Sequence, residues 1–186
     1  MKISVYTIAI ETFVPMLRTL SNILDKGAQH ASARNFDSAV LVNARLAPDM
    51  FPLVKQVQIA CDNAKDSTAR LLGQEPPRFE DNEQTLDELK ARIARTIDYL
   101  QRERATAFEG AEDRDIKIPL PNNLTLEMKG LQFLRDWALP HFYFHVVTAY
   151  DILRHNGVDI GKRDYLSHVA GAIRQHSDRE LPAAGR

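Results

Sequence analysis

Apolar residues recur at spacings of three and four along several segments, and this periodicity constrains the fold more than any other feature of the sequence. In the first segment, about residues 5–31, the repeated positions are Phe13, Leu17, Leu20, Leu24 and Ala28. Such spacing places side chains on one face of an α-helix. Pro15 either lies in the first turn of this helix or kinks a longer one. After a break at residues 34–37, a short helix is expected within residues 38–46.

A second helix is predicted to start near Pro48 or Asp49 and to end at Leu72. Its apolar stripe comprises Leu53, Val57, Ala60, Cys61, Ala64, Thr68 and Leu71. Gly73 suits the position just after a helix, because glycine adopts the left-handed conformation without strain. Two consecutive prolines in residues 74–77 then prevent the helix from continuing.

The third helix has a clear start signal, and a hairpin is expected after it. Thr85 and Glu88 match a capping box, in which each side chain satisfies a free backbone N–H of the first turn. Residues 116–120 and 124–128 alternate between apolar and polar side chains, which indicates two short strands joined by Pro121-Asn122-Asn123. Two strands alone are marginally stable, so this hairpin is expected to lie against the helices.

The fourth helix, about residues 131–155, is apolar around much of its circumference. One side carries Phe133, Trp137, Phe144 and Thr148, and another carries Leu139, Phe142 and Val146. A helix of this kind is usually buried on more than one side. Either it is central in the fold or its second face packs against another subunit, and we therefore expect a homodimer.

Four helices with short to medium connections indicate an all-α fold, an antiparallel four-helix bundle with a small β-hairpin between the third and fourth helices. A chain of 186 residues is long enough to bury a core without disulfides or metals. We expect one domain over residues 1–167, followed by a partly flexible C-terminal extension over residues 168–186. We find no internal repeat.

Composition excludes several classes of function. The net charge of −1 gives no basic footprint, so no nucleic-acid partner is expected. No stretch approaches the roughly 20 consecutive apolar residues that a membrane span needs, so no membrane partner is expected. The single cysteine rules out an intrachain disulfide, and the N-terminal residues lack a clear signal-peptide core. These features together predict a cytoplasmic protein.

The most informative motif is the pair His141 and His145. Histidines four residues apart stand one turn apart on the same helix face, and two imidazoles in that geometry can bind one divalent ion. The alternative is that both are structural histidines, each hydrogen-bonded within the core. Spacing alone leaves both interpretations open, because no third ligand is evident.

The sequence after this pair resembles the last helix of the DinB/YfiT-like metalloenzyme superfamily. There the second histidine is similarly followed by a Leu-Arg pair, here Leu153-Arg154, and by a Gly-Val at the helix end, here Gly157-Val158. More closely, the chain resembles a bacterial family of unknown function within that superfamily, up to about Leu166. The segments that carry this resemblance are residues 45–50, 56–62, 70–73, 142–145 and 153–162.

The resemblance implies a helical bundle, often dimeric, with a zinc- or nickel-type ion held by three histidines, one on the second helix and two on the fourth. His141 and His145 occupy the fourth-helix positions, but the second helix contains no histidine. Counting back from Gly73 places the missing ligand near Gln58, with Asp62 one turn further on. Asp62 could bind a divalent cation, whereas Gln58 would be a weak neutral ligand. Cys61 is a further option, although a lone cysteine in an apolar stripe usually packs.

Two hypotheses for the function follow. In the first, the chain is a metal-dependent enzyme with a divalent ion inside the bundle, and thiol-transfer chemistry is the analogy that the superfamily offers. In the second, the chain is a non-catalytic dimeric bundle that binds a small apolar ligand, and its histidines are structural. The identity of any small-molecule substrate or ligand is not encoded in these motifs.

Overall fold

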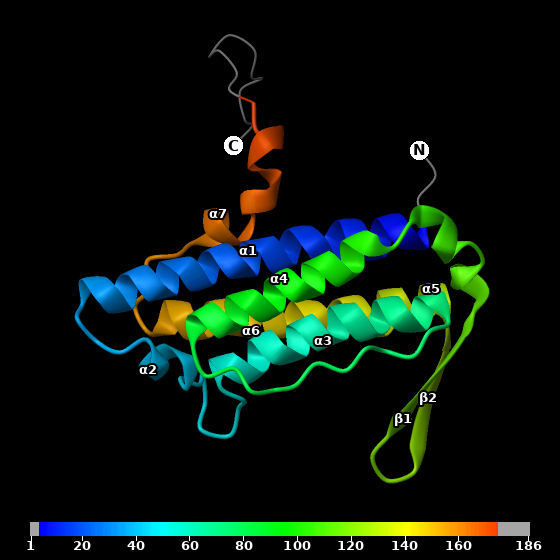
Figure 1. The fold of residues 1–186 in the computed structure, drawn as a ribbon, viewed down its shortest axis with the longest axis horizontal. Helices are drawn as coiled ribbons and strands as arrows, with labels where there is room; N and C mark the ends of the chain where they lie inside the picture. The colour runs from blue at the N-terminus through cyan, green and yellow to red at the C-terminus, as the bar shows by residue number, and fades with distance from the viewer. Residues whose placement is uncertain (1–3, 175–186) are drawn as a thin grey trace, which may run out of the picture.

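The computed structural model describes residues 4–174, which are mostly helical with one small two-stranded antiparallel sheet (Figure 1). The longer elements are α1 (Val5–Ala33), α3 (Leu53–Leu72), α4 (Leu86–Arg102), β1 (Asp115–Leu120), β2 (Leu124–Lys129) and α6 (Leu139–His155). Single-turn or short pieces are α2 (Ala39–Val42), η1 (Ala105–Phe108), η2 (Ala111–Asp113), α5 (Gly130–Phe133), η3 (Leu134–Ala138), α7 (Lys162–Tyr165) and η4 (Ser167–Ala172). Part of the C-terminal extension expected from the sequence, residues 175–186, lies outside the described residues.

Helix α1 begins where Ser4 caps it, because the Ser4 hydroxyl accepts a hydrogen bond from the Thr7 backbone N–H. Pro15 therefore lies inside this long helix and not in its first turn. The apolar stripe predicted for this helix is fully buried, apart from Ala28 at its edge: Phe13, Leu17, Leu20 and Leu24.

Helix α3 starts later than the sequence predicts. Pro52 is its N-cap, with extended backbone angles (φ −68°, ψ 167°), so the helix begins at Leu53 and not near Pro48. The side chain of Arg45 donates to the carbonyl of Met50 and so helps to hold the preceding loop out of the helix. The other end is as predicted: Gly73 adopts the left-handed conformation (φ 71°) directly after Leu72.

The long helices do not simply alternate in direction, which departs from the expected antiparallel bundle. Helices α1 and α6 run one way, whereas α3 and α4 both run the other way (Figure 1). Residues 73–85 make this possible, because they return in extended form along α3. Lys65 donates to the carbonyl of Pro77, and Gln58, nearer the start of α3, donates to Glu83 at 2.9 Å. Helix α4 then starts with the predicted capping box of Thr85 and Glu88.

The hairpin forms as predicted but projects away from the bundle (Figure 1). Its register pairs Asp115 with Lys129 at the base and Leu120 with Leu124 at the tip. Only the base is well packed, since Ile116 is buried whereas Leu124 is 61% exposed. The expectation that the hairpin lies against the helices therefore holds for its base and not for its tip.

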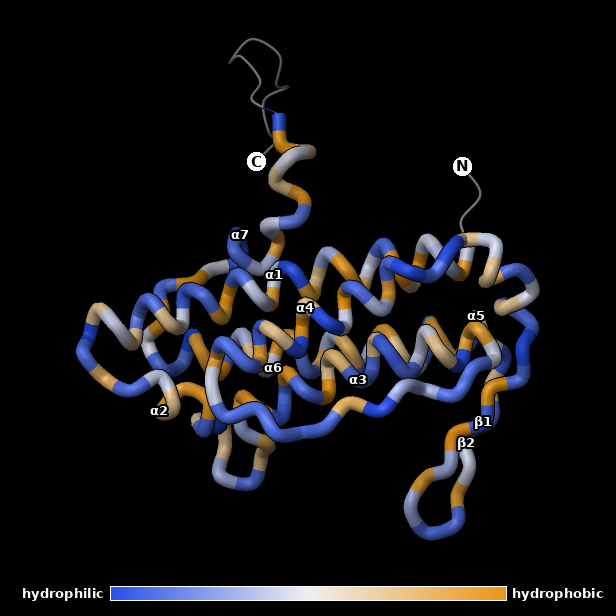
Figure 2. The backbone as a smooth tube through the Cα atoms, viewed as in Figure 1, coloured by the Kyte–Doolittle hydropathy of each residue, from blue (hydrophilic) through white to orange (hydrophobic). Residues whose placement is uncertain are grey.

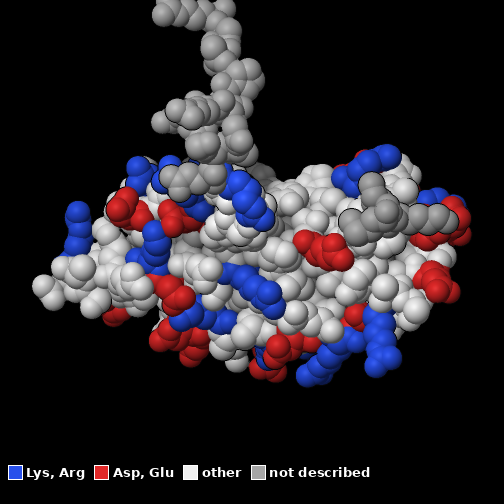
Figure 3. All heavy atoms as spheres, turned by 90° about the horizontal axis from the view of Figure 1, so that it is seen from above, with Lys and Arg blue, Asp and Glu red and all other residues white. Residues whose placement is uncertain are grey.

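Hydrophobic and hydrophilic residues alternate along each long helix (Figure 2), and the buried hydrophobic residues of these helices form one core. On the face seen in Figure 3, basic and acidic side chains alternate without a large patch of one sign. Within residues 4–174, no helix is both long enough and apolar enough to cross a lipid bilayer.

Candidate functional site

A widened helical turn positions the histidine motif. Residues Leu134–Ala138 form a π-helical turn between α5 and α6, in which the Leu139 N–H bonds back to the carbonyl of Leu134. The next residue is Pro140, which has no N–H to donate to the preceding turn. Turns of this type are rare and frequently occur at functional sites. Here the turn brings Trp137 edge-on to His141, with ring centroids 5.7 Å apart.

The structure brings His141 and His145 together on the side of α6 that faces α3. Their ring centroids are 4.9 Å apart, as the one-turn spacing predicts. His145 is buried, at 6% exposure, and His141 is half-buried. The pair therefore lies at the contact between two long helices and not on the outer surface.

Each imidazole is hydrogen-bonded through Nδ1 to an amide side chain of α3. His145 Nδ1 is 2.7 Å from Oε1 of Gln56, and because an amide oxygen only accepts, this Nδ1 carries the proton. His141 Nδ1 is 2.9 Å from Nδ2 of Asn63, and because an amide nitrogen only donates, this Nδ1 is the acceptor. The two neutral rings therefore have opposite tautomers.

Burial keeps both rings uncharged. It lowers the pKa of His141, and it lowers the pKa of His145 to about 4, with a further contribution from the neighbouring His141. A charged imidazolium would lose hydration here without gaining a carboxylate partner. At neutral pH the pair is thus two neutral imidazoles.

The two α3 residues predicted as ligands lie elsewhere. Gln58 donates to Glu83 in the returning segment. Asp62 is 2.8 Å from Arg92 and 3.6 Å from Lys65, although one side of it also lines the cleft beside His141. Burial raises the pKa of Asp62, against the opposing effect of both cations. The structure does not bring Gln58 and Asp62 together with the histidines as a ligand set.

The residues that do meet the histidines, Gln56 and Asn63, were missed by the sequence argument. They are seven residues apart, which is close to two helical turns, so they share the α6-facing side of α3. Gln58 and Asp62 share the side that faces α4 and the returning segment. The signal in the sequence was only that Gln56 and Asn63 are amide side chains two turns apart on one helix face, which does not by itself single them out.

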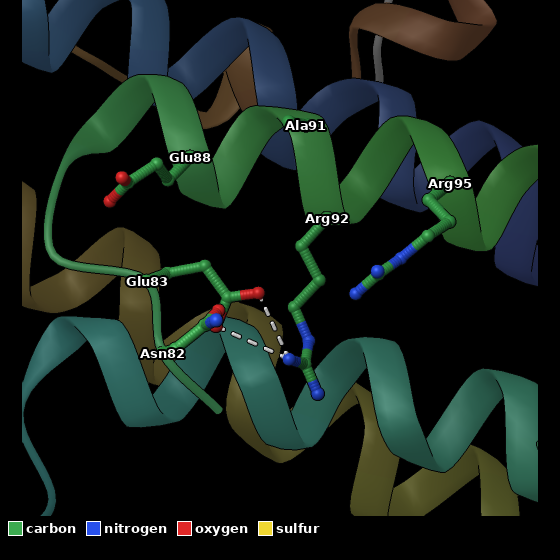
Figure 4. A pocket seen from close by; sticks show the side chains of 6 residues that line it. All are labelled: Asn82, Glu83, Glu88, Ala91, Arg92 and Arg95. Atoms are coloured by element: carbon green, nitrogen blue, oxygen red, sulfur yellow. Dashed lines mark hydrogen bonds and ion pairs between the residues drawn. The ribbon is translucent and has the colours of Figure 1, made fainter. Parts of the chain in front are cut away.

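Arg92 organises a separate, charged cluster on the α4 side of α3. Its buried guanidinium contacts Asp62, Asp81 (2.9 Å) and Glu83 (3.0 Å) and donates to the carbonyl of Glu80. Figure 4 shows Arg92 reaching from α4 toward Glu83 of the returning segment. These contacts join α3, α4 and the returning segment, which is a structural role.

Cys61 also faces this side and packs without exposure to solvent. Burial raises the pKa of its thiol to about 12, against the opposing effects of a hydrogen bond with Thr96 and of the nearby Arg92. The group is therefore a thiol at neutral pH. The ligand role considered for Cys61 would need a thiolate.

The residues present do not fit the three-histidine ion that the resemblance implies. Within residues 4–174, no group of three or more His, Cys, Asp or Glu side chains is arranged to hold a metal ion. In addition, the amide nitrogen of Asn63 lies at Nδ1 of His141, so Nε2 of this ring could bind an ion only if the amide turned over and the ring proton moved to Nδ1. Nε2 of His145 needs no such change, because Nδ1 of that ring lies against an acceptor.

A cleft of about 220 Å³ lies beside His141, between α3, the base of the hairpin and the π-helical turn. Its apolar wall consists of Ile59, Ile118, Phe133 and Trp137. Its polar side consists of Asp62, Asn63, Asp66, Ser67, Arg70 and His141. Oδ1 of Asn63 is buried and has no hydrogen-bond partner within the described part of the chain.

Comparisons with known proteins agree with this fold. The profile of a domain of unknown function (DUF1993) matches residues 5–166. The crystal structure of a DinB family member protein from Shewanella denitrificans is 41% identical, with 95% of each chain covered and a TM-score of 0.80. No curated protein matches the chain. The family match spans most of the chain, and the chain therefore belongs to the DUF1993 family; the similar crystal structure is described as that of a DinB family member.

Proposed function

We propose that this protein is a ligand-binding helical bundle whose small-molecule site is the cleft beside His141. The observation that carries the proposal is the convergence, in one cleft, of an aromatic wall at Trp137 and a polar wall at Asn63 and His141. Sites that combine a mostly apolar lining with a few fixed polar groups are the usual form of small-molecule pockets. The π-helical turn that shapes this wall adds to the argument.

The lining also defines the ligand. A volume of about 220 Å³ is below the usual range for drug-sized ligands, so the ligand is a small molecule with a flat apolar body. The unpartnered Oδ1 of Asn63 favours a ligand that donates an N–H or O–H group. The sequence anticipated a small apolar ligand, and the cleft adds this polar requirement.

The first hypothesis, a zinc- or nickel-dependent enzyme with thiol-transfer chemistry, rests on the superfamily. His141 and His145 lie together, as this hypothesis requires. At the place where α3 would have to supply the third metal ligand, however, it presents side-chain amides. We therefore derive no metal-dependent step. A cytoplasmic location and the lack of a nucleic-acid partner stay predictions from composition.

The single tryptophan of the chain, Trp137, provides a direct test. We would titrate the protein with small non-fluorescent heteroaromatic amides and phenols and record tryptophan emission, excited at 295 nm and corrected for absorption by the probe. We expect at least one of these classes to shift or quench the emission saturably. Ile118→Glu, which places a charge in the cleft wall, should abolish the effect. Leu124→Glu, at the exposed tip of the same hairpin, is the matched control.

Two results would overturn the proposal. One is that none of these probe classes changes the Trp137 emission. The other is that a saturable change survives Ile118→Glu, because the ligand would then bind away from the cleft.

A homodimer through the outer face of α6 is part of the same proposal. Phe144 and Val147 leave an apolar surface there, at 58% and 39% exposure.

A further inference from the structure

We propose that the side-chain amides of Gln56 and Asn63 take the place of a metal ion in this bundle. Their hydrogen bonds to His145 and His141 fix the two rings in opposite tautomers. The two bonds together form a metal-free clasp between α3 and α6. The inference shares Asn63 and His141 with the proposed ligand cleft but does not require a bound ligand. It concerns how α3 and α6 are joined and what role the histidine pair has without a third ligand in place.

The first step is geometric. A bound ion would hold α6 to α3 through imidazole nitrogens on one helix and a ligand on the other. Here the same two helices are joined by direct hydrogen bonds of 2.7 Å and 2.9 Å. Gln56 is 1% exposed and Asn63 is 8% exposed, so both amides are buried, as His145 is. Buried polar groups of this kind need their partners, which makes the clasp specific.

The second step concerns the lone pairs. A metal-bound histidine commonly donates its other ring N–H to a hydrogen-bond acceptor, which fixes the tautomer. The bond from His145 Nδ1 to Gln56 has this form and leaves Nε2 of His145 free. The bond from Asn63 to His141 has the opposite direction, so His141 has no nitrogen left for an ion. As long as Asn63 donates to Nδ1, His141 therefore offers no lone pair to an ion.

Substitution of Asn63 by Asp tests this step directly. A carboxylate can only accept, so Asn63→Asp should force the proton of His141 onto Nδ1 and free Nε2. Replacement of Gln56 by Met removes the acceptor of His145. Gln56→Glu keeps an acceptor there, so the tautomer of His145 should be preserved.

The measurement is long-range ¹H–¹⁵N correlation NMR of the histidine rings near pH 7, on the full-length chain. In the unmodified protein we expect the Nδ1–H form for His145 and the Nε2–H form for His141. Asn63→Asp should switch His141 to the Nδ1–H form, and Gln56→Met should remove the Nδ1–H preference of His145. Gln58→Met is the matched control, because Gln58 is equally buried on α3 but bonds to Glu83. It should leave both tautomers unchanged, even if it lowers the melting temperature.

Zinc and nickel provide the second readout. Addition of either ion, or of a chelator, should leave the melting temperature and the histidine ¹⁵N shifts of the unmodified protein unchanged. The proposal is overturned if one equivalent of either ion moves the shifts of both rings, or if both rings show the same tautomer. It is also overturned if Asn63→Asp folds and leaves the His141 tautomer as it was.

Discussion

His145 is 6% exposed and lies beside a second imidazole, and both circumstances oppose its protonation. Its pKa is lowered from 6.5 to about 4, with burial as the larger cause. The ring gains nothing from a nearby carboxylate that would offset the loss of hydration. The contribution of His145 to the free energy of unfolding therefore depends on the ring staying neutral, so this contribution varies with pH.

The pH dependence has a defined sign. Above pH 6.5 the ring is neutral in both states, so its contribution is fully present. As the pH falls from 6.5 to about 4, the unfolded chain binds a proton that the folded chain does not, and the free energy of unfolding decreases. The total loss is about 3 kcal/mol for this shift. Urea denaturation between pH 4 and pH 7 should show it, and His145→Gln should flatten the profile.

His168, which is exposed, supplies the control for this experiment. His168→Gln should keep the slope of the unmodified protein. If His145→Gln and the unmodified protein lose stability equally between these pH values, burial does not hold His145 neutral.

A second prediction at the residue scale concerns Arg92. Arg92→Met should lower the free energy of unfolding by about 3 kcal/mol, because Glu83 would keep a buried carboxylate without its cation. Arg95→Met is the control. Arg95 is exposed and stacks over the ring of Phe79 at 3.9 Å, so its loss should cost less than about 1 kcal/mol. Equal losses in chemical denaturation would mean that the buried cluster is not a stabilising feature.

At the scale of elements, the start of α5 depends on a close backbone contact. A Cβ atom on Gly130 would lie 1.8 Å from the carbonyl oxygen of Ala111 in η2. Gly130→Ala must therefore shift backbone and should cost more than about 2 kcal/mol. Gly171→Ala meets no atom of residues 4–174 within 4 Å and should change stability by less than about 0.5 kcal/mol. Thermal unfolding of both variants checks this, and similar melting temperatures would contradict it.

Elements with local signals could be predicted from the sequence, and their mutual orientation could not. The capping box at Thr85 and the left-handed Gly73 depend on neighbouring residues, so both were predictable. The parallel direction of α3 and α4 depends on long-range bonds of the returning segment, such as Lys65 to Pro77. For the same reason the sequence could predict that His141 and His145 share one helix face. It could not predict that Gln56, and not Gln58, bonds to His145, because this depends on which side of α3 meets α6.

At the scale of the whole molecule, the outer side of α6 is the feature that the monomer leaves unexplained. The inner side of this helix is packed, with Phe142 and Val146 fully buried. The sequence grouped Phe144 with Phe133, Trp137 and Thr148 on one apolar side. In the structure Phe133 and Thr148 are buried, whereas Phe144 is exposed together with Val147, which belonged to neither predicted side. Phe51, at 55% exposure, lies close to this side. Its carbonyl accepts a hydrogen bond from Gln56, and Gln56 also bonds to His145. The ring of His145 in turn contacts that of Phe144.

Two such surfaces facing each other would remove apolar area from water, which is the main favourable contribution to association. A stable interface needs roughly 800 Å² from each partner, so α6 would have to be joined by neighbouring surface such as that around Phe51. We therefore expect a dimer at micromolar concentration in light scattering after size exclusion. Phe144→Glu should yield a folded monomer, because two carboxylates would be buried against each other. Leu124→Glu, at the tip of the hairpin, should leave the dimer intact. Two outcomes would contradict this: a monomeric mass for the unmodified protein, or a dimer that persists in Phe144→Glu. Either would mean that the exposed side of α6 has no role in self-association.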